Sequence, residues 1–145
     1  MKQEEINEII LKHALWLDNK DGGDRADLRC ANLSGDDLSD ANLRKAALSD
    51  ADLRRANLRG ANLSNVDLRS AALSDADLRW ADLRWADLRW ANLRWAKLID
   101  ADLRGANLSN VDLRVADLSG AKMRQQDMDA AALTKEQRDS IVVCD

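Results

Sequence analysis

Leucine returns at every fifth position along most of this chain of 145 residues. The series begins at Leu28 and keeps its frame without interruption to Leu118, after which Met123, Met128 and Leu133 occupy the same register. Alanine usually stands two residues before each central residue, aspartate or asparagine directly before it, and arginine or serine directly after it. The repeated unit is therefore A-(D/N)-L-(R/S)-x, in which the fifth residue varies.

A period of five residues fits neither of the regular backbones. In an α-helix five residues advance about 500°, so the leucines would spiral around every side. In a flat strand an odd period places successive leucines on opposite faces. Both difficulties disappear when each pentapeptide contains a bend of about a quarter turn, because about four pentapeptides then close one coil with leucine and alanine inside. Aspartate and asparagine suit such a bend, since their short side chains bond to nearby backbone.

Residues 26–133 resemble the pentapeptide-repeat family, because the A-(D/N)-L-(R/S)-x motif recurs throughout them. The resemblance implies an all-β fold, namely a right-handed quadrilateral β-helix. Coils of this kind stack with their amides paired at a spacing of about 4.8 Å. A repeat region of this length predicts about five coils, with alanine and leucine filling a narrow interior.

The segments outside the repeats are predicted to cap the coils, whose ends would otherwise expose apolar interior and unpaired amides. Residues 1–25 are expected to form a helix over residues 3–17 and a turn into the first coil. One face of this helix is formed by Ile6, Ile9, Ile10, His13 and Leu17.

Residues 134–145 are predicted to form the C-terminal cap. Thr134 and Gln137 make a T-x-x-Q pattern, which is typical of a helix N-terminus. The apolar residues 141–143 either cover the last coil or join two chains end to end. We favour the monomer over a two-fold dimer.

Two interior positions depart from the repeat. Asp36 and Gln126 stand where alanine is expected. Both lie near an end of the array, where a cap or water can supply hydrogen-bond partners. We expect wider or distorted coils there.

The sequence predicts no enzyme, cofactor or metal site. His13 is the only histidine, and its position on the apolar helix face favours packing over catalysis. The recurrent aspartates belong to the repeat and face outward beside arginine or serine, as expected of a solvated surface. No phosphate-binding, dinucleotide-binding, nucleophile-elbow or zinc-protease motif occurs. The charged N-terminus and the lack of a long apolar run predict a cytoplasmic protein that does not enter membranes.

Charge argues against direct binding of nucleic acid. The net charge is −4, and acidic and basic residues are nearly balanced within the repeats. Some pentapeptide-repeat proteins mimic duplex DNA and engage DNA gyrase or other type II topoisomerases. The resemblance therefore implies an alternative function as a topoisomerase modulator, but such mimicry needs a continuous acidic face along the rod.

A cluster of tryptophans is the strongest local anomaly. Trp80, Trp85, Trp90 and Trp95 fill the fifth position of four consecutive repeats, so they should encircle the rod, one on each side. Tryptophan is enriched at protein interfaces, which makes this belt the candidate contact for a partner protein. The alternative is a duplicated or designed cassette whose tryptophans are tolerated on the surface. We therefore expect a non-catalytic scaffold that binds another protein or has a structural role.

Overall fold

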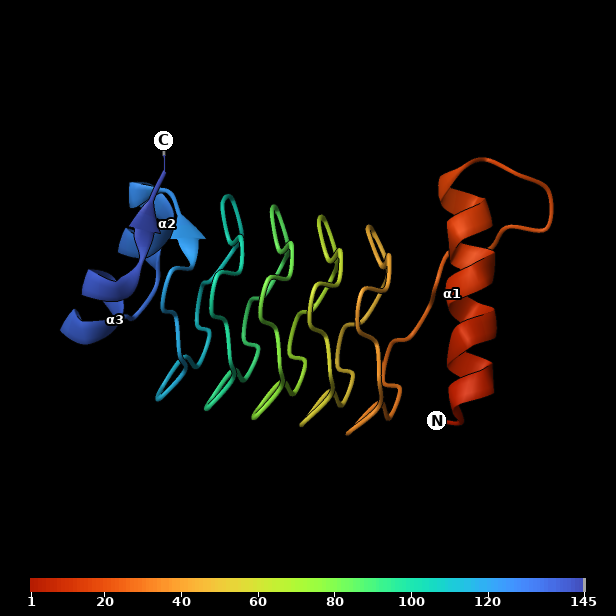
Figure 1. Cartoon of the computed structure of the whole chain (residues 1–145), viewed down its shortest axis with the longest axis horizontal. Helices are drawn as coiled ribbons and strands as arrows, with labels where there is room; N and C mark the ends of the chain where they lie inside the picture. Colours follow the sequence, from red (N-terminus) through yellow and green to blue (C-terminus); the bar gives the residue numbers. More distant parts are fainter. Residues whose placement is uncertain (145) are drawn as a thin grey trace.

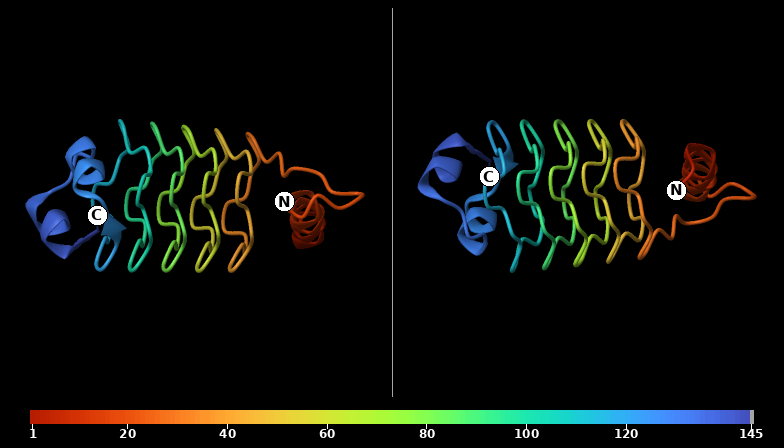
Figure 2. Two further views of the ribbon diagram at one scale, coloured as in Figure 1. Left: turned by 90° about the horizontal axis from the view of Figure 1, so that it is seen from above. Right: turned by 90° about the horizontal axis from the view of Figure 1, so that it is seen from below.

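A computed structural model describes residues 1–144 of the chain (Figure 1). Helix α1 (Gln3–Leu17) lies across one end of a stack of coils, and the chain then runs through the stack to the other end. There it forms strand β1 (Lys122–Met123), helices α2 (Gln125–Ala130) and α3 (Lys135–Ser140), and strand β2 (Val142–Val143). The views from above and below show the same arrangement, with α1 beside the first coil and α2 and α3 beside the last (Figure 2).

The coils are joined by a ladder with a period of twenty residues. Every isolated bridge is parallel and joins residues twenty positions apart, from Asp27 with Ala47 to Asp102 with Lys122. The Leu28 N–H donates to the Ala47 carbonyl at 2.8 Å, and the Ala47 N–H donates back to the Ala26 carbonyl at 3.0 Å. One circuit of the solenoid therefore takes four pentapeptides, as the repeat predicted.

Each pentapeptide contains a tight turn that explains its consensus. The Ala31 N–H donates to the Leu28 carbonyl at 3.1 Å, and the intervening Cys30 has a φ of 57°. A positive φ at the third residue of a β-turn is the mark of a type II turn, which favours glycine and asparagine there. The side chain before each leucine supports the same turn: Asn32 Oδ1 accepts from the Ser34 N–H at 3.1 Å.

Leucine and alanine fill the interior as predicted. The central leucines from Leu28 to Leu118 are at most 2% exposed, and most alanines two residues earlier are equally buried. The valines that replace alanine at positions 66 and 111 are 1% and 8% exposed, so the coil accepts them inside.

Helix α1 has the predicted bounds and buries most of the predicted face, although Leu17 at its end is only partly buried. Ile6 and His13 are completely buried, while Ile9 and Ile10 pack against the core at its edge. His13 Nδ1 accepts the Ala26 N–H at 3.0 Å, so Nε2 must carry the proton that is donated to the Arg44 carbonyl at 2.9 Å. The neutral imidazole thus connects the helix to the first coil, and burial lowers its pKa below the usual histidine value.

The N-terminal segment supplies a hydrogen-bond and charge partner for Asp36, which stands at an interior position of the repeat. Its carboxylate lies 3.4 Å from the Met1 ammonium, which also donates to the Asn32 carbonyl at 3.1 Å. The first departure from alanine therefore coincides with a contact between cap and coil, as the sequence suggested.

Gln126, the second departure from alanine, does not face the interior, because the coils end before the series of leucine positions does. Residues 125–130 form helix α2 instead of a further repeat, and Gln126 is exposed on this helix instead of facing an interior. Asp127 explains the change. Its carboxylate accepts the Gly105 N–H at 2.9 Å, whereas other fifth-position N–H groups, such as that of Gly60, donate to a backbone carbonyl of the next coil. The Arg124 carbonyl is therefore free to accept hydrogen bonds from the Asp127 and Met128 N–H groups of α2.

Helix α3 begins at the predicted capping box and covers the last coil. Gln137 N–H donates to Thr134 Oγ1 at 3.2 Å, and Gln137 Oε1 accepts the Thr134 N–H at 3.0 Å. The same glutamine donates from Nε2 to the carbonyls of Leu113 and Ala116 at 2.8 and 3.2 Å. Strand β2 then pairs in parallel with β1 at the twenty-residue offset, with both of its valines about half exposed. Whether those valines join two chains stays a prediction.

Candidate protein-binding surface

The four tryptophans of the belt stand at turn positions that disfavour large side chains. Trp80, Trp85, Trp90 and Trp95 have φ values of 59°, 60°, 59° and 57°. Residues other than glycine, asparagine and aspartate rarely adopt this left-handed conformation. The indoles are nevertheless 49%, 59%, 57% and 47% exposed, so burial does not compensate for the backbone conformation.

The belt lies at one level of the rod and is divided among its sides. Residues twenty apart are stacked neighbours, and the four tryptophans fall within one circuit of twenty residues. Each tryptophan therefore belongs to a different stack of pentapeptides. We call each stack of pentapeptides a side of the rod and name it after its tryptophan.

Arginines stack on the indoles, although not always the arginine next in sequence. Arg79, Arg89 and Arg94 lie over Trp80, Trp90 and Trp95 at 5.7, 5.6 and 4.1 Å from the ring centroid. Trp80 also contacts Arg59 of the preceding coil at 4.4 Å. These contacts hold the indoles by cation–π attraction.

The arginine that stacks on Trp85 is not the one next to it in sequence. Its neighbour Arg84 is bound to Asp82 at 2.7 Å, and Arg124 lies over the Trp85 ring at 4.9 Å instead. Arg124 is in turn held by Asp127 at 2.7 Å, so the indole is tied to the C-terminal cap. Local sequence could not identify this partner, which lies two circuits further along the chain.

The outward aspartates and arginines form paired units within the repeats. In the sequence D-x-R two of the three guanidinium nitrogens donate to the carboxylate, as when Arg104 Nε and Nη2 donate to Asp102 at 2.8 and 2.6 Å. The same arrangement lowers the pKa of Asp112, through Arg114, to about 2. Where asparagine replaces aspartate, as at Asn42, the following arginine lacks this partner.

Charge is distributed unequally among the sides. The Trp85 side comprises residues 41–45, 61–65, 81–85, 101–105 and 121–125. Its basic residues are Arg44, Lys45, Arg84, Arg104, Lys122 and Arg124, against the acidic residues Asp82 and Asp102. The Trp80 side comprises residues 36–40, 56–60, 76–80, 96–100 and 116–120. Its acidic residues are Asp36, Asp37, Asp40, Asp77, Asp100 and Asp117, against the basic residues Arg59, Arg79 and Lys97. Comparing residues twenty positions apart in the sequence would have revealed this difference in charge.

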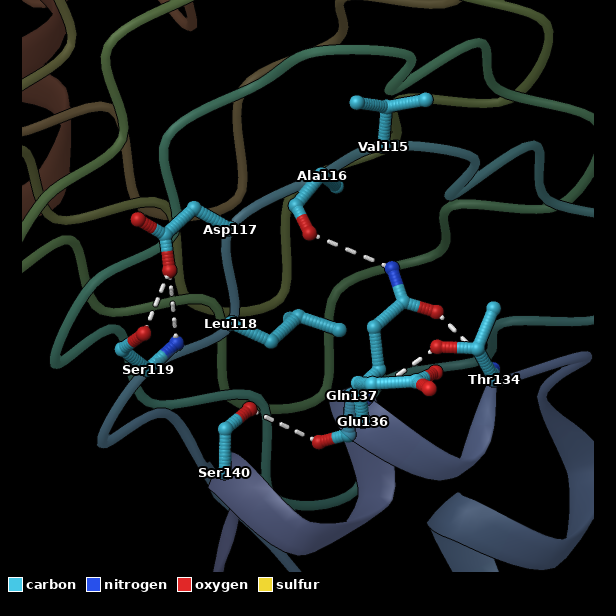
Figure 3. Close-up of a pocket in the computed structure, with 9 residues that line it drawn as sticks. All are labelled: Val115, Ala116, Asp117, Leu118, Ser119, Thr134, Glu136, Gln137 and Ser140. Carbon is cyan, nitrogen blue, oxygen red and sulfur yellow. Dashed lines mark hydrogen bonds between the residues drawn. The ribbon is translucent and has the colours of Figure 1, made fainter.

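A hollow of about 500 Å³ lies between residues 115–119 and helix α3 (Figure 3). The side chain of Gln137 points from α3 to the Ala116 carbonyl at its edge, which is a capping contact. Among residues 1–144, no group of three histidine, cysteine, aspartate or glutamate side chains is arranged to hold a metal ion. No helix in this range is long and apolar enough to cross a membrane.

Comparison with known proteins now assigns the family. A family model described as pentapeptide repeats matches residues 46–84 and 86–125 in eight copies, which is more than half of the chain. The chain belongs to the pentapeptide-repeat family. No curated protein sequence matches this pentapeptide-repeat protein.

Several solved structures are similar to this pentapeptide-repeat protein. A pentapeptide repeat protein from the Arabidopsis thaliana thylakoid lumen is 31% identical, with 78% of this chain and 72% of that chain covered and a TM-score of 0.48. Another, from Nostoc PCC 7120, is 30% identical, with coverage of 92% and 93% and a TM-score of 0.31. QnrB1, a plasmid-mediated fluoroquinolone resistance protein, is 18% identical, with coverage of 82% and 77% and a TM-score of 0.32. Because these superpositions are loose, they assign no partner to this chain.

Proposed function

We propose that this pentapeptide-repeat protein is a non-catalytic scaffold that binds another protein through Trp80, Trp85, Trp90 and Trp95. The observation that carries the proposal is the half-exposure of four indoles at positive φ. Neither backbone preference nor burial favours tryptophan at these positions. Binding of a partner would bury the indoles and account for their presence.

We propose that the rod that carries the tryptophan belt is a right-handed quadrilateral β-helix of about five coils. The twenty-residue ladder and the one turn in each pentapeptide support four sides in each coil. A four-sided rod would separate the indoles, so a flat partner would contact one or two of them and a partner that surrounds the rod would contact more.

We propose that this scaffold has no catalytic activity. Both nitrogens of His13 are engaged with backbone groups, which leaves no free base on the only imidazole. The D-x-R aspartates are held in ion pairs with lowered pKa values, which suits a stable surface and not proton transfer. The scaffold that we propose is cytoplasmic and works without a cofactor.

We also propose that the protein acts as a monomer. Helix α1 covers the first coil, and helix α3 covers the last through Gln137. The half-exposed Val142 and Val143 leave an end-to-end dimer as the alternative, which light scattering of the purified protein would detect.

Modulation of a type II topoisomerase by DNA mimicry is the second candidate. The acidic excess of the Trp80 side favours it. Arg59, Arg79 and Lys97 occupy the three middle coils of that side, however, and Arg79 neutralises Asp77 in an ion pair, so the acidic face is interrupted there. Mimicry of a continuous phosphate backbone is therefore the weaker proposal. A supercoiling assay with DNA gyrase tests it, and dose-dependent inhibition would favour it over simple scaffolding.

The scaffold proposal is tested by capture of partners on the immobilised protein. We expect a protein bound by the intact rod to be lost when all four belt tryptophans are replaced by serine. Val115→Ser is the matched control, because Val115 also occupies an exposed fifth position at positive φ but lies outside the belt. Circular dichroism must first show that both variants fold. Equal capture by the intact rod and the belt variant would refute the proposal.

A further inference from the structure

The Trp85 side carries positive charge that its own carboxylates do not neutralise. Three of its six basic residues are paired: Arg84 with Asp82 at 2.7 Å, Arg104 with Asp102 at 2.6 Å, and Arg124 with Asp127 at 2.7 Å. The other three are Arg44, Lys45 and Lys122, which are exposed. Within residues 1–144, none of these three forms an ion pair.

These free cations lie at the two ends of the side, with Trp85 midway. Arg44 and Lys45 belong to the first coil of this side, Trp85 to the third and Lys122 to the fifth. At about 4.8 Å for each coil, the two charged ends are separated by about 19 Å. Between the first end and Trp85, the second coil contributes the uncharged Asn62, Ser64 and Asn65. Between Trp85 and Lys122, the fourth coil contributes Asp102 and Arg104, which neutralise each other in an ion pair.

Trp85 is also the most exposed tryptophan of the belt, and its indole is held in place by the C-terminal cap. Its indole is 59% exposed, yet one part of the ring lies against Gly105, where any added Cβ would overlap it. Arg124 contacts the ring, and Asp127 holds Arg124 while accepting the Gly105 N–H. A side chain fixed in this way loses little conformational entropy when a partner binds.

We propose that the Trp85 side binds an extended acidic segment of a partner protein, with carboxylates near both ends and an apolar residue at its centre. An extended segment needs about six residues to span about 19 Å. The carboxylates would meet Arg44 and Lys45 at one end and Lys122 at the other, and the apolar residue would lie on Trp85. This inference rests on the proposed function, because it specifies the partner of one part of the belt.

A protein segment fits these charges better than a nucleic acid does. A phosphodiester chain carries a charge at every nucleotide and requires a continuous excess of cations. Here the central arginines are neutralised by Asp82 and Asp102, and the adjoining Trp80 side is acidic. Charge complementarity limited to the two ends selects a ligand with few, separated anionic groups.

The test uses a synthetic peptide of about ten residues with two glutamates near each end and a central leucine, titrated into the full-length protein. Binding is measured by calorimetry and by the indole N–H resonances of the tryptophans. We expect the Trp85 resonance to shift more than that of Trp95, and the double variant K45E/K122E to weaken binding about tenfold or more. The matched control is Arg55→Glu, which also reverses a charge at an exposed fifth position but lies on the Trp95 side.

Three outcomes would overturn the inference: no binding of the peptide, equal weakening by Arg55→Glu, or tighter binding of a single-stranded oligonucleotide of the same charge. The first two would show that the side has no specific acidic ligand, and the third would assign it to nucleic acid. Failure of the belt itself is distinguishable. If the peptide binds the intact protein but capture of partners is unchanged when Trp80, Trp90 and Trp95 are replaced by serine, the Trp85 side stands while the shared belt does not.

Discussion

The middle coils and the two ends of this rod satisfy the same backbone requirements in different ways. In the middle, the backbone of each coil is hydrogen-bonded to the backbones of the coils before and after it, so the same short motif can serve at every position. At the ends no neighbour exists, and individual side chains take over: His13 accepts the Ala26 N–H, Asp127 accepts the Gly105 N–H, and Gln137 donates to two carbonyls. Repetition therefore stabilises the interior of the solenoid, whereas unique residues define its length.

The largest effect is expected from the interior of a middle coil. Leu78→Ala removes a fully buried side chain and leaves a cavity between identical neighbours that cannot easily collapse. We expect the free energy of unfolding to fall by about 3 kcal/mol, measured by denaturant titration. Leu11→Ala on α1 is the control, since Leu11 is 63% exposed and should change stability little. Similar losses for both variants would show that the coils do not carry most of the stability.

An intermediate effect is expected from the C-terminal end. Asp127→Ala removes the carboxylate that accepts the Gly105 N–H and binds Arg124, leaving a donor of the last ladder unpaired. We expect a loss of about 2 kcal/mol. Hydrogen exchange should increase at Gly105 and in α2 while the middle coils stay protected, because repeat stability is transmitted between neighbours. Uniform loss of protection would instead indicate that the cap and the coils unfold as one unit.

Much of this fold was predictable because its information is local and repeated. The turn at each fifth residue, the buried leucines and the helix over residues 3–17 follow from short patterns. The end of the coils did not follow, since Met128 keeps the leucine frame while Asp127 reaches back to Gly105 and starts a helix. That contact depends on residues brought together by the coil and is absent from any local motif.

The candidate surface shows the same limit. The indole positions and three of the neighbouring arginine contacts followed from the repeat. The contact of Arg124 with Trp85 required knowledge of where the array ends, because an additional coil in place of α2 would change the surroundings of that arginine. The unequal charge of the sides was present in the sequence but becomes visible only when residues twenty apart are compared.

The smallest effect is expected from acidification at the N-terminal end, since it removes no atom. Burial lowers the pKa of His13, and the Arg25 and Arg44 cations act in the same direction. The unfolded chain therefore binds a proton near its ordinary pKa of 6.5, before the folded chain does. Stability from this residue is complete above that pH and declines as pH falls toward the lower folded pKa. Denaturant titrations between about pH 7 and pH 5 should show this decline, because histidine is the side chain that titrates there. The variant His13→Gln should lose the decline; if its stability falls equally, the N-terminal cap does not depend on a neutral imidazole.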